Sequence, residues 1–115
     1  MSDTEYRVSF TDYAAGQLSD VFNYISFDLS SPEVAVDWTY RIQKKLMCLM
    51  YAPERIKLTD EEPWRSRNVH RFSVENFYAY FLIDESEKRV WIIAFVYAKR
   101  DQKRQLKQMD DASKN

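Results

Sequence analysis

The sequence predicts an α+β fold: an N-terminal strand, an antiparallel helical hairpin, and then a three-stranded antiparallel meander. Residues 5–10 alternate polar and apolar side chains, and residues 12–51 hold two successive apolar stripes at helical spacing. Residues 69–97 hold three runs rich in aromatic and β-branched side chains. The 115-residue chain is long enough for one domain, which we place at 5–109, with flexible termini at 1–4 and 110–115.

The first strand is predicted at residues 5–10, where Tyr6, Val8 and Phe10 fall on one face. Thr11 follows as a candidate N-cap, with an acid directly after it in the first helical turn. The helix that begins here carries one apolar stripe, which we expect to be buried. Its members are Ala14, Leu18, Val21, Phe22, Ile25 and Leu29.

A second helix is predicted to begin at Ser31 as N-cap and Pro32 as the first helical residue, and to end before Pro53. Because few residues separate the two helices, they should fold back as an antiparallel hairpin. Cys48 lies within the apolar pattern, and we expect it to be a small buried group rather than a nucleophile. The second stripe consists of Ala35, Trp38, Ile42, Leu46 and Leu49.

Residues 53–66 have neither helical nor strand periodicity, and two prolines and an acidic cluster predict a long loop. The cluster Asp60-Glu61-Glu62 is better explained as a solvated turn than as a metal site, because adjacent carboxylates point in different directions. One cysteine and one histidine cannot build a zinc site from protein ligands alone. We therefore predict neither a metal nor a cofactor.

The meander is predicted to use strands at 69–74, 77–83 and 90–97, with Glu75-Asn76 as a two-residue turn in which the asparagine has positive φ. Residues 84–89 form a longer polar loop. Strict alternation places four apolar residues on one face of the middle strand and three on the other. The first set is Phe77, Ala79, Phe81 and Ile83, and the second is Tyr78, Tyr80 and Leu82. In the last strand the sets are Val90, Ile92, Ala94 and Val96 against Trp91, Ile93, Phe95 and Tyr97.

A sheet with helices on one side normally presents a polar face to water, but here both faces are apolar. The second face therefore needs a cover, which could be the C-terminal segment, another subunit or a binding partner. The residues from 99 onward are mostly charged, so we favour a partner protein.

The net charge of −1 hides an asymmetry along the chain. Residues 1–63 carry 6 basic and 11 acidic side chains, whereas residues 64–109 carry 10 basic and 5 acidic ones. The second half could bind an anionic partner, either a nucleic acid or an acidic protein segment, although a solvated charged surface explains the pattern equally well. No signal peptide and no membrane span are recognisable, so we expect a cytoplasmic protein that does not contact a membrane.

The order of elements resembles the RelE/ParE toxin superfamily of bacterial type II toxin–antitoxin modules, over roughly residues 5–106. Four segments carry the resemblance, by their order and spacing. They are Ser-Pro-Glu-Val-Ala at 31–35, Glu-Pro-Trp-Arg-Ser at 62–66, Asn-Phe-Tyr-Ala-Tyr-Phe at 76–81 and Val-Tyr-Ala-Lys-Arg-Asp at 96–101. The resemblance implies a growth-inhibiting toxin that forms an oligomer with a cognate antitoxin.

The two branches of this superfamily differ in their targets. RelE-like toxins cut mRNA on the ribosome without a metal, and ParE-like toxins poison DNA gyrase. Of the positions at which RelE-type enzymes carry catalytic groups, this sequence retains Arg100 and offers His70 as a chemically possible substitute. The others are occupied by Phe72, Ala79 and Leu106. The resemblance therefore favours a ParE-like toxin, with an mRNA endonuclease and a non-toxic binding module as alternatives.

These considerations give three sets of candidate residues. For a nuclease the catalytic pair is His70 and Arg100. The residues expected to bind the target or a nucleic acid are Arg65, Arg67, Arg71, Lys99, Arg100 and Arg104. The residues expected to contact the antitoxin are Phe77, Ala79, Phe81, Trp91 and Phe95. The alternative is that His70 is not catalytic and is a surface histidine beside a basic rim that binds an acidic antitoxin.

Overall fold

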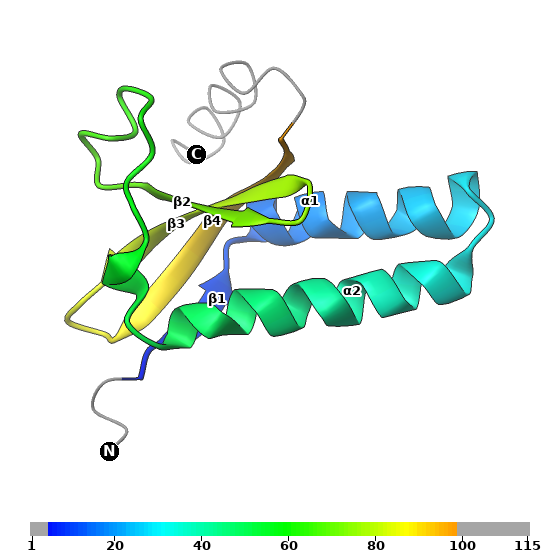
Figure 1. Ribbon diagram of the computed structural model, residues 1–115, viewed down its shortest axis with the longest axis horizontal. Helices are drawn as coiled ribbons and strands as arrows, with labels where there is room; N and C mark the ends of the chain where they lie inside the picture. The colour runs from blue at the N-terminus through cyan, green and yellow to red at the C-terminus, as the bar shows by residue number, and fades with distance from the viewer. Residues whose placement is uncertain (1–4, 99–115) are drawn as a thin grey trace.

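The computed structural model describes residues 5–98, in which a helical hairpin packs on a four-stranded sheet (Figure 1). The strand order is β1-β4-β3-β2, with β1 parallel to β4 and the other neighbours antiparallel. The strands are β1 (Arg7–Phe10), β2 (His70–Val74), β3 (Phe77–Asp84) and β4 (Arg89–Tyr97). The helices are α1 (Asp12–Asn23), η2 (Tyr24–Asp28), α2 (Pro32–Leu46), η3 (Met47–Met50) and η4 (Pro53–Arg55). The predicted fold class and element order are confirmed.

The first arm of the hairpin begins where the sequence predicts. The Thr11 hydroxyl accepts a hydrogen bond from the Ala14 amide at 3.2 Å, which satisfies one of the unpaired N–H groups of the first turn. α1 then passes into the single π-helical turn η2, which closes with a bond from the Leu29 amide to the Tyr24 carbonyl. Leu29 was expected in the buried stripe, but the helix ends at Asp28 and its side chain is exposed.

The second arm buries the predicted stripe: Ala35, Trp38, Ile42, Leu46 and Leu49 are all buried. Cys48, in contrast, is exposed, and the expectation that it is a buried apolar group is wrong. The reason is helical geometry. Residues 46–50 are all apolar, but only those about three positions apart share a face, so Leu46 and Leu49 turn inward and Cys48 turns outward.

A bulge in β4 decides which side chains face the helices. Tyr80 pairs with Ala94 but Phe81 pairs with Ile92, so Ile93 is the extra residue on β4. Beyond it the alternation reverses, and Phe95 joins the helix-facing cluster while Ala94 and Val96 join the opposite one. The strict alternation predicted for this strand is therefore correct only from Val90 to Ile93.

The main core lies between the hairpin and the helix-facing side of the sheet. Trp38 of α2 meets Phe77 and Phe95 edge-on, with ring centroids 5.6 and 6.2 Å apart, and those two phenylalanines stack at 4.7 Å. Such aromatic contacts add to the free energy of burying large side chains. This cluster attaches α2 to the two central strands, at the end of the sheet next to the β2–β3 turn.

The connection between η3 and β2 covers part of the other side of the sheet. Trp64 and Val69 of this connection are buried with Tyr80, Ala94 and Val96. Backbone bonds from Thr59 N to the Val69 carbonyl and from Arg71 N to the Lys57 carbonyl hold it against β2. A cover supplied by this connection was not among the three that we considered from the sequence.

The turn between β2 and β3 is tied to the second helix. Glu75, not the predicted Asn76, has the positive φ of 56°. Its carboxylate accepts hydrogen bonds from Arg41 Nε at 2.5 Å and from Lys45 Nζ at 3.4 Å. The bond from Arg41 is the main cause that lowers the pKa of Glu75.

The helices were also compared with the length and hydrophobicity that a membrane span needs. In the described part of the chain, no helix is long and apolar enough to cross a membrane.

We predict that Ile42→Ala lowers the free energy of unfolding by about 2–5 kcal/mol, because Ile42 is fully buried and its removal leaves a cavity. The neighbouring Gln43→Ala, at an exposed helical position, should change it by less than about 0.5 kcal/mol. Urea unfolding followed by circular dichroism measures both values. Equal effects of the two variants would contradict this account of the core.

Candidate functional site

The sheet surface that faces away from the hairpin is the candidate functional site, and we call it the second face. Its side chains come from alternate positions of three strands: Arg71 of β2, Tyr78, Tyr80 and Leu82 of β3, and Trp91 of β4. Tyr80 is fully buried, whereas the other four are partly exposed. The second face therefore offers cationic, aromatic and aliphatic groups together.

Three arginines lie over aromatic rings on and beside the second face. The guanidinium carbon of Arg71 lies 4.4 Å from the ring centre of Tyr78. The other two pairs, at 5.1 Å each, are Arg67 over Trp64 and Arg89 over Trp91. A guanidinium over an aromatic face keeps its N–H edge available for an anion while its plane is packed.

The three pairs are joined to different parts of the fold. Arg89 also donates a hydrogen bond from Nη1 to Ser9 Oγ at 2.8 Å, which fixes it between β4 and β1. Arg71 stands on β2, and Arg67 belongs to the connection that covers this side of the sheet. The surface is thus assembled from segments that are far apart in the sequence.

The hydroxyl group of Tyr80 is buried, and it has no hydrogen-bond partner of standard geometry among residues 5–98, although the Arg71 guanidinium lies close to it. The pKa of Tyr80 is raised to about 12, first by burial and then by the charge of Glu61, while Arg71 acts in the opposite direction. One carboxylate oxygen of Glu61 is also buried without a hydrogen-bond partner. A phenol, a carboxylate and a guanidinium are therefore close neighbours under the 51–69 connection.

His70 lies on the side of the sheet that faces the helices. Its ring stacks on Phe81 with centroids 4.9 Å apart and planes 9° from parallel, and its Nδ1 lies 2.7 Å from the Ile56 carbonyl oxygen. Because a carbonyl oxygen only accepts, Nδ1 carries a proton, and in the neutral ring Nε2 is the acceptor. Arg71 is next to it on the strand and therefore points to the opposite face.

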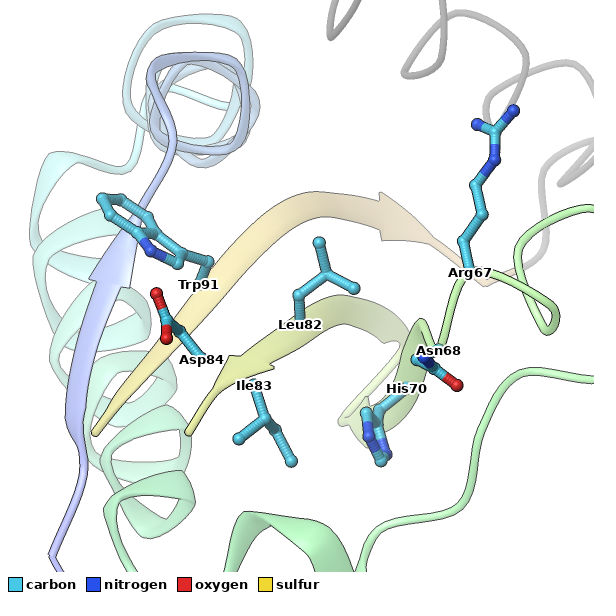
Figure 2. Close-up of a pocket in the computed structure, with 7 residues that line it drawn as sticks. All are labelled: Arg67, Asn68, His70, Leu82, Ile83, Asp84 and Trp91. Carbon is cyan, nitrogen blue, oxygen red and sulfur yellow. The ribbon is translucent and has the colours of Figure 1, made fainter. Parts of the chain in front are cut away.

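Figure 2 shows a pocket at the end of β3 that is lined by side chains from both sides of the sheet. Its volume is about 360 Å³. Leu82 and Trp91 project to one side of the sheet there, and Ile83 and His70 project to the other. β2 pairs with β3 only as far as Phe81, so the last three residues of β3 border the pocket instead of a strand. The remaining lining residues are Arg67, Asn68 and Asp84.

The structure separates the residues that the sequence suggested as one phosphate-binding group around a histidine. Arg71 is on the second face, and Arg67 lies over Trp64 beside it, while His70 is on the other side. Arg65 is exposed and lies 3.4 Å from Asp60. Lys99, Arg100 and Arg104 lie outside the described residues.

The residues expected to contact an antitoxin divide into two groups. Ala79, Phe81 and Phe95 are at most 1% exposed and lie in the core beneath the helices, so they offer no surface to a partner and that expectation is corrected. The bulge in β4 turns Phe95 toward the helices. Ala79 and Phe81 are buried because the helices pack on their side of β3. Phe77 is partly exposed at the edge of the same core, and Trp91 is partly exposed on the second face.

Sequence reasoning missed Trp64, Tyr78 and Tyr80 as members of the site. The two tyrosines could have been found, because they alternate on β3 with the residues now seen in the core. The position of Trp64 depends on the path of the 51–69 connection, and no periodic signal marks it.

This arrangement is chemically suited to binding. Partly packed guanidinium groups beside aromatic rings can hold a carboxylate or a phosphate and stack on a planar group. Proton transfer by His70 to a group bound on the second face has no support in the geometry, because the imidazole is on the other side of the sheet. Among residues 5–98, no three His, Cys, Asp or Glu side chains gather into a possible metal site.

A chain described as the chromosomal ParDE TA (toxin–antitoxin) system from P. aeruginosa has a similar structure, with a TM-score of 0.68. It is 19% identical in sequence, and the match covers 84% of this chain and 99% of that chain. No protein-family model and no curated protein matches the sequence. The fold that the sequence resemblance implied is therefore confirmed, because this chain shares it with a chain of a ParDE system.

We predict that the buried Tyr80 makes the protein less stable as the pH rises above about 10. The unfolded tyrosine loses its proton near its ordinary pKa of 10.0, whereas folded Tyr80 keeps it until about pH 12, so ionisation favours the unfolded state. Tyr80→Phe should make this fall shallower. It should not abolish the fall, because burial also raises the pKa of Tyr6 and Tyr13.

Denaturant unfolding between about pH 9 and about pH 11 measures the slope. Tyr40→Phe, at an exposed position on α2, is the matched control and should keep the slope of the wild type. A Tyr80→Phe slope equal to that of the wild type would contradict the assignment.

Proposed function

We propose that this protein is the toxin of a bacterial type II toxin–antitoxin module, of the ParE-like branch. It acts in the cytoplasm by binding a cellular target, for which DNA gyrase is the first candidate, and a cognate antitoxin neutralises it. The observation that carries the choice of branch is the placement of His70 and Arg71 on opposite faces of the sheet.

Membership in a toxin–antitoxin module is supported by the fold shared with a chain of a ParDE system. Sequence identity of 19% supports no more than the fold, and one fold can carry different activities. The choice between a gyrase poison and an mRNA nuclease therefore depends on the chemistry of the second face.

Metal-free cleavage of RNA through its 2′-hydroxyl needs a proton acceptor, a proton donor and cations around one phosphate. His70 is the only histidine of the chain, and its ring stacks on Phe81 beneath the level of the second face. Arg71 packs on Tyr78 across the sheet from it. One phosphate could not contact both groups, which favours binding over cleavage.

The same surface supports a division of contacts between the two partners. We propose that Arg65, Arg67 and Arg71 take part in target binding, together with Lys99, Arg100 and Arg104 outside the described residues. Of the residues first considered for the antitoxin, Trp91 and the partly exposed Phe77 remain as candidates. The mixed cationic and aromatic surface suits an extended segment with carboxylates.

We predict that expression of the chain alone arrests bacterial growth and that Arg71→Glu relieves the arrest by at least about tenfold in colony-forming units. The substitution replaces the cation on Tyr78 by an anion, and the loss of one charged contact commonly costs a tenfold or larger factor in binding. Arg55→Glu in η4 is the control, because it makes the same charge change away from the second face.

Growth curves and plating after induction measure the arrest, with soluble yield checked by gel. Absence of arrest at good soluble expression of the wild type would support a non-toxic binding module instead. Trapping of gyrase–DNA breaks by the purified protein would identify the target directly.

One observation favours an mRNA endonuclease as a second candidate: guanidinium and aromatic groups alternate on the second face, as in surfaces that stack on single-stranded bases. If the protein cuts mRNA, purified protein added to a translation reaction should produce ends at fixed codon positions. We expect no such ends.

Cuts that persist in His70→Gln but disappear in Arg71→Glu would assign cleavage to the second face without the histidine. Cuts that disappear in His70→Gln would overturn the present assignment of that residue. Circular dichroism of each variant separates loss of activity from loss of folding.

A further inference from the structure

The helical hairpin extends well past the edge of the sheet, so its end does not cover the sheet (Figure 1). This end carries large apolar side chains that are more than half exposed, and we call it the hairpin tip. Its apolar members are Tyr24, Phe27, Leu29, Val34, Val36 and Tyr40. Phe27 and Tyr40 are 72% and 71% exposed, which is unusual for groups of this size.

The apolar residues of the hairpin tip are close to one another in the chain. Tyr24 and Phe27 are three residues apart in the π-helical turn η2, and Val36 and Tyr40, four residues apart in α2, share one face of that helix. The buried stripe of α2 faces away from Val36 and Tyr40, so these two are not extensions of the core. Groups of large exposed apolar side chains mark interaction surfaces.

The charge around these residues has one sign. From residue 8 to residue 40 the sequence holds five acidic residues and no lysine or arginine. Asp20, Asp28 and Glu33 are exposed at the hairpin tip, and they form no ion pair with any other residue of 5–98. Asp37 is paired with Arg41 at 3.0 Å, where the basic part of α2 begins.

The exposed apolar side chains and the carboxylates together limit which kinds of molecule could bind to the hairpin tip. A nucleic acid or an anionic lipid surface would be repelled by the carboxylates. Two copies of the hairpin tip facing each other across a two-fold axis would bring like charges together. A polypeptide with apolar and basic side chains on one face satisfies both the exposed rings and the carboxylates.

We propose that the hairpin tip binds an amphipathic, basic polypeptide segment of a partner protein. This site is separate from the second face, where the positive charges of Arg71 and Arg89 suit acidic groups. The protein would therefore have two docking surfaces of opposite charge preference. The inference rests on the hairpin alone and does not require that the chain be a toxin.

A synthetic amphipathic helix made of leucine and lysine tests the proposal, with a leucine and glutamate helix of the same pattern as the comparison. Titration of each labelled peptide with the full-length protein, followed by fluorescence anisotropy, gives the two dissociation constants. We expect the lysine peptide to bind at least about tenfold more tightly, and added salt to weaken it.

Two variants test the location of the site. Phe27→Ser together with Tyr40→Ser should weaken binding of the lysine peptide by about tenfold or more, because both rings are exposed and lie away from the core. Asp28→Lys together with Glu33→Lys should weaken binding of the lysine peptide by a similar factor. It should also reduce the difference between the dissociation constants of the lysine and glutamate peptides. Met47→Ser, at an exposed apolar position in η3 just after the basic end of α2, is the control and should bind as the wild type does.

Equal binding of both peptides, or equal binding by the hairpin-tip variants and the wild type, would overturn the proposal. A dimer of the wild type in sedimentation experiments, converted to a monomer by Phe27→Ser with Tyr40→Ser, would also overturn it. A second copy of the chain would then be what binds to the hairpin tip. Growth arrest is measured separately for these variants, so failure of the peptide test and failure of the toxin hypothesis can be told apart.

Discussion

Packing of Trp38 against Phe77 and Phe95 is the interaction on which the rest of the structure depends. It brings α2 onto the two central strands, at the end of the sheet next to the β2–β3 turn, and it selects the side of β3 and β4 that the helices cover. It also determines the overhang of the hairpin. Because the contact lies near the middle of α2, the helix N-terminus and η2 extend beyond the sheet and remain exposed. The hairpin tip is therefore a consequence of where the core contact falls.

The alternation of side chains along one short strand has the largest consequence for function. His70 and Arg71 are adjacent in the sequence, and a strand necessarily sends them to opposite faces. The stacking of His70 on Phe81 and its contact with the Ile56 carbonyl oxygen keep it on the helix side. Arg71 is free to join the aromatic residues of the second face. A surface that could have been catalytic is in this way better suited to binding.

The separation of charge along the sequence becomes a separation in space. The hairpin is acidic at its tip, and the second face carries three arginines packed on rings. Packing a guanidinium on an aromatic ring limits its motion without neutralising its charge, so the positive charges of Arg71 and Arg89 can attract an anionic group. Each surface can therefore discriminate between partners by charge as well as by apolar contact.

The sequence by itself determined the element order, the buried stripe of α2, the Thr11 cap and the two apolar faces of the meander, because these depend on local periodicity and on capping chemistry. It also determined that acidic and basic halves exist. Only the tertiary structure decided which side of the sheet the helices cover, because both sides of β3 are apolar. The bulge at Ile93 has no local signal, and it moved Phe95 into the core. The cover supplied by Trp64 and Val69 depends on a long connection whose path is set by pairing with β2, a contact between segments that periodicity cannot reveal.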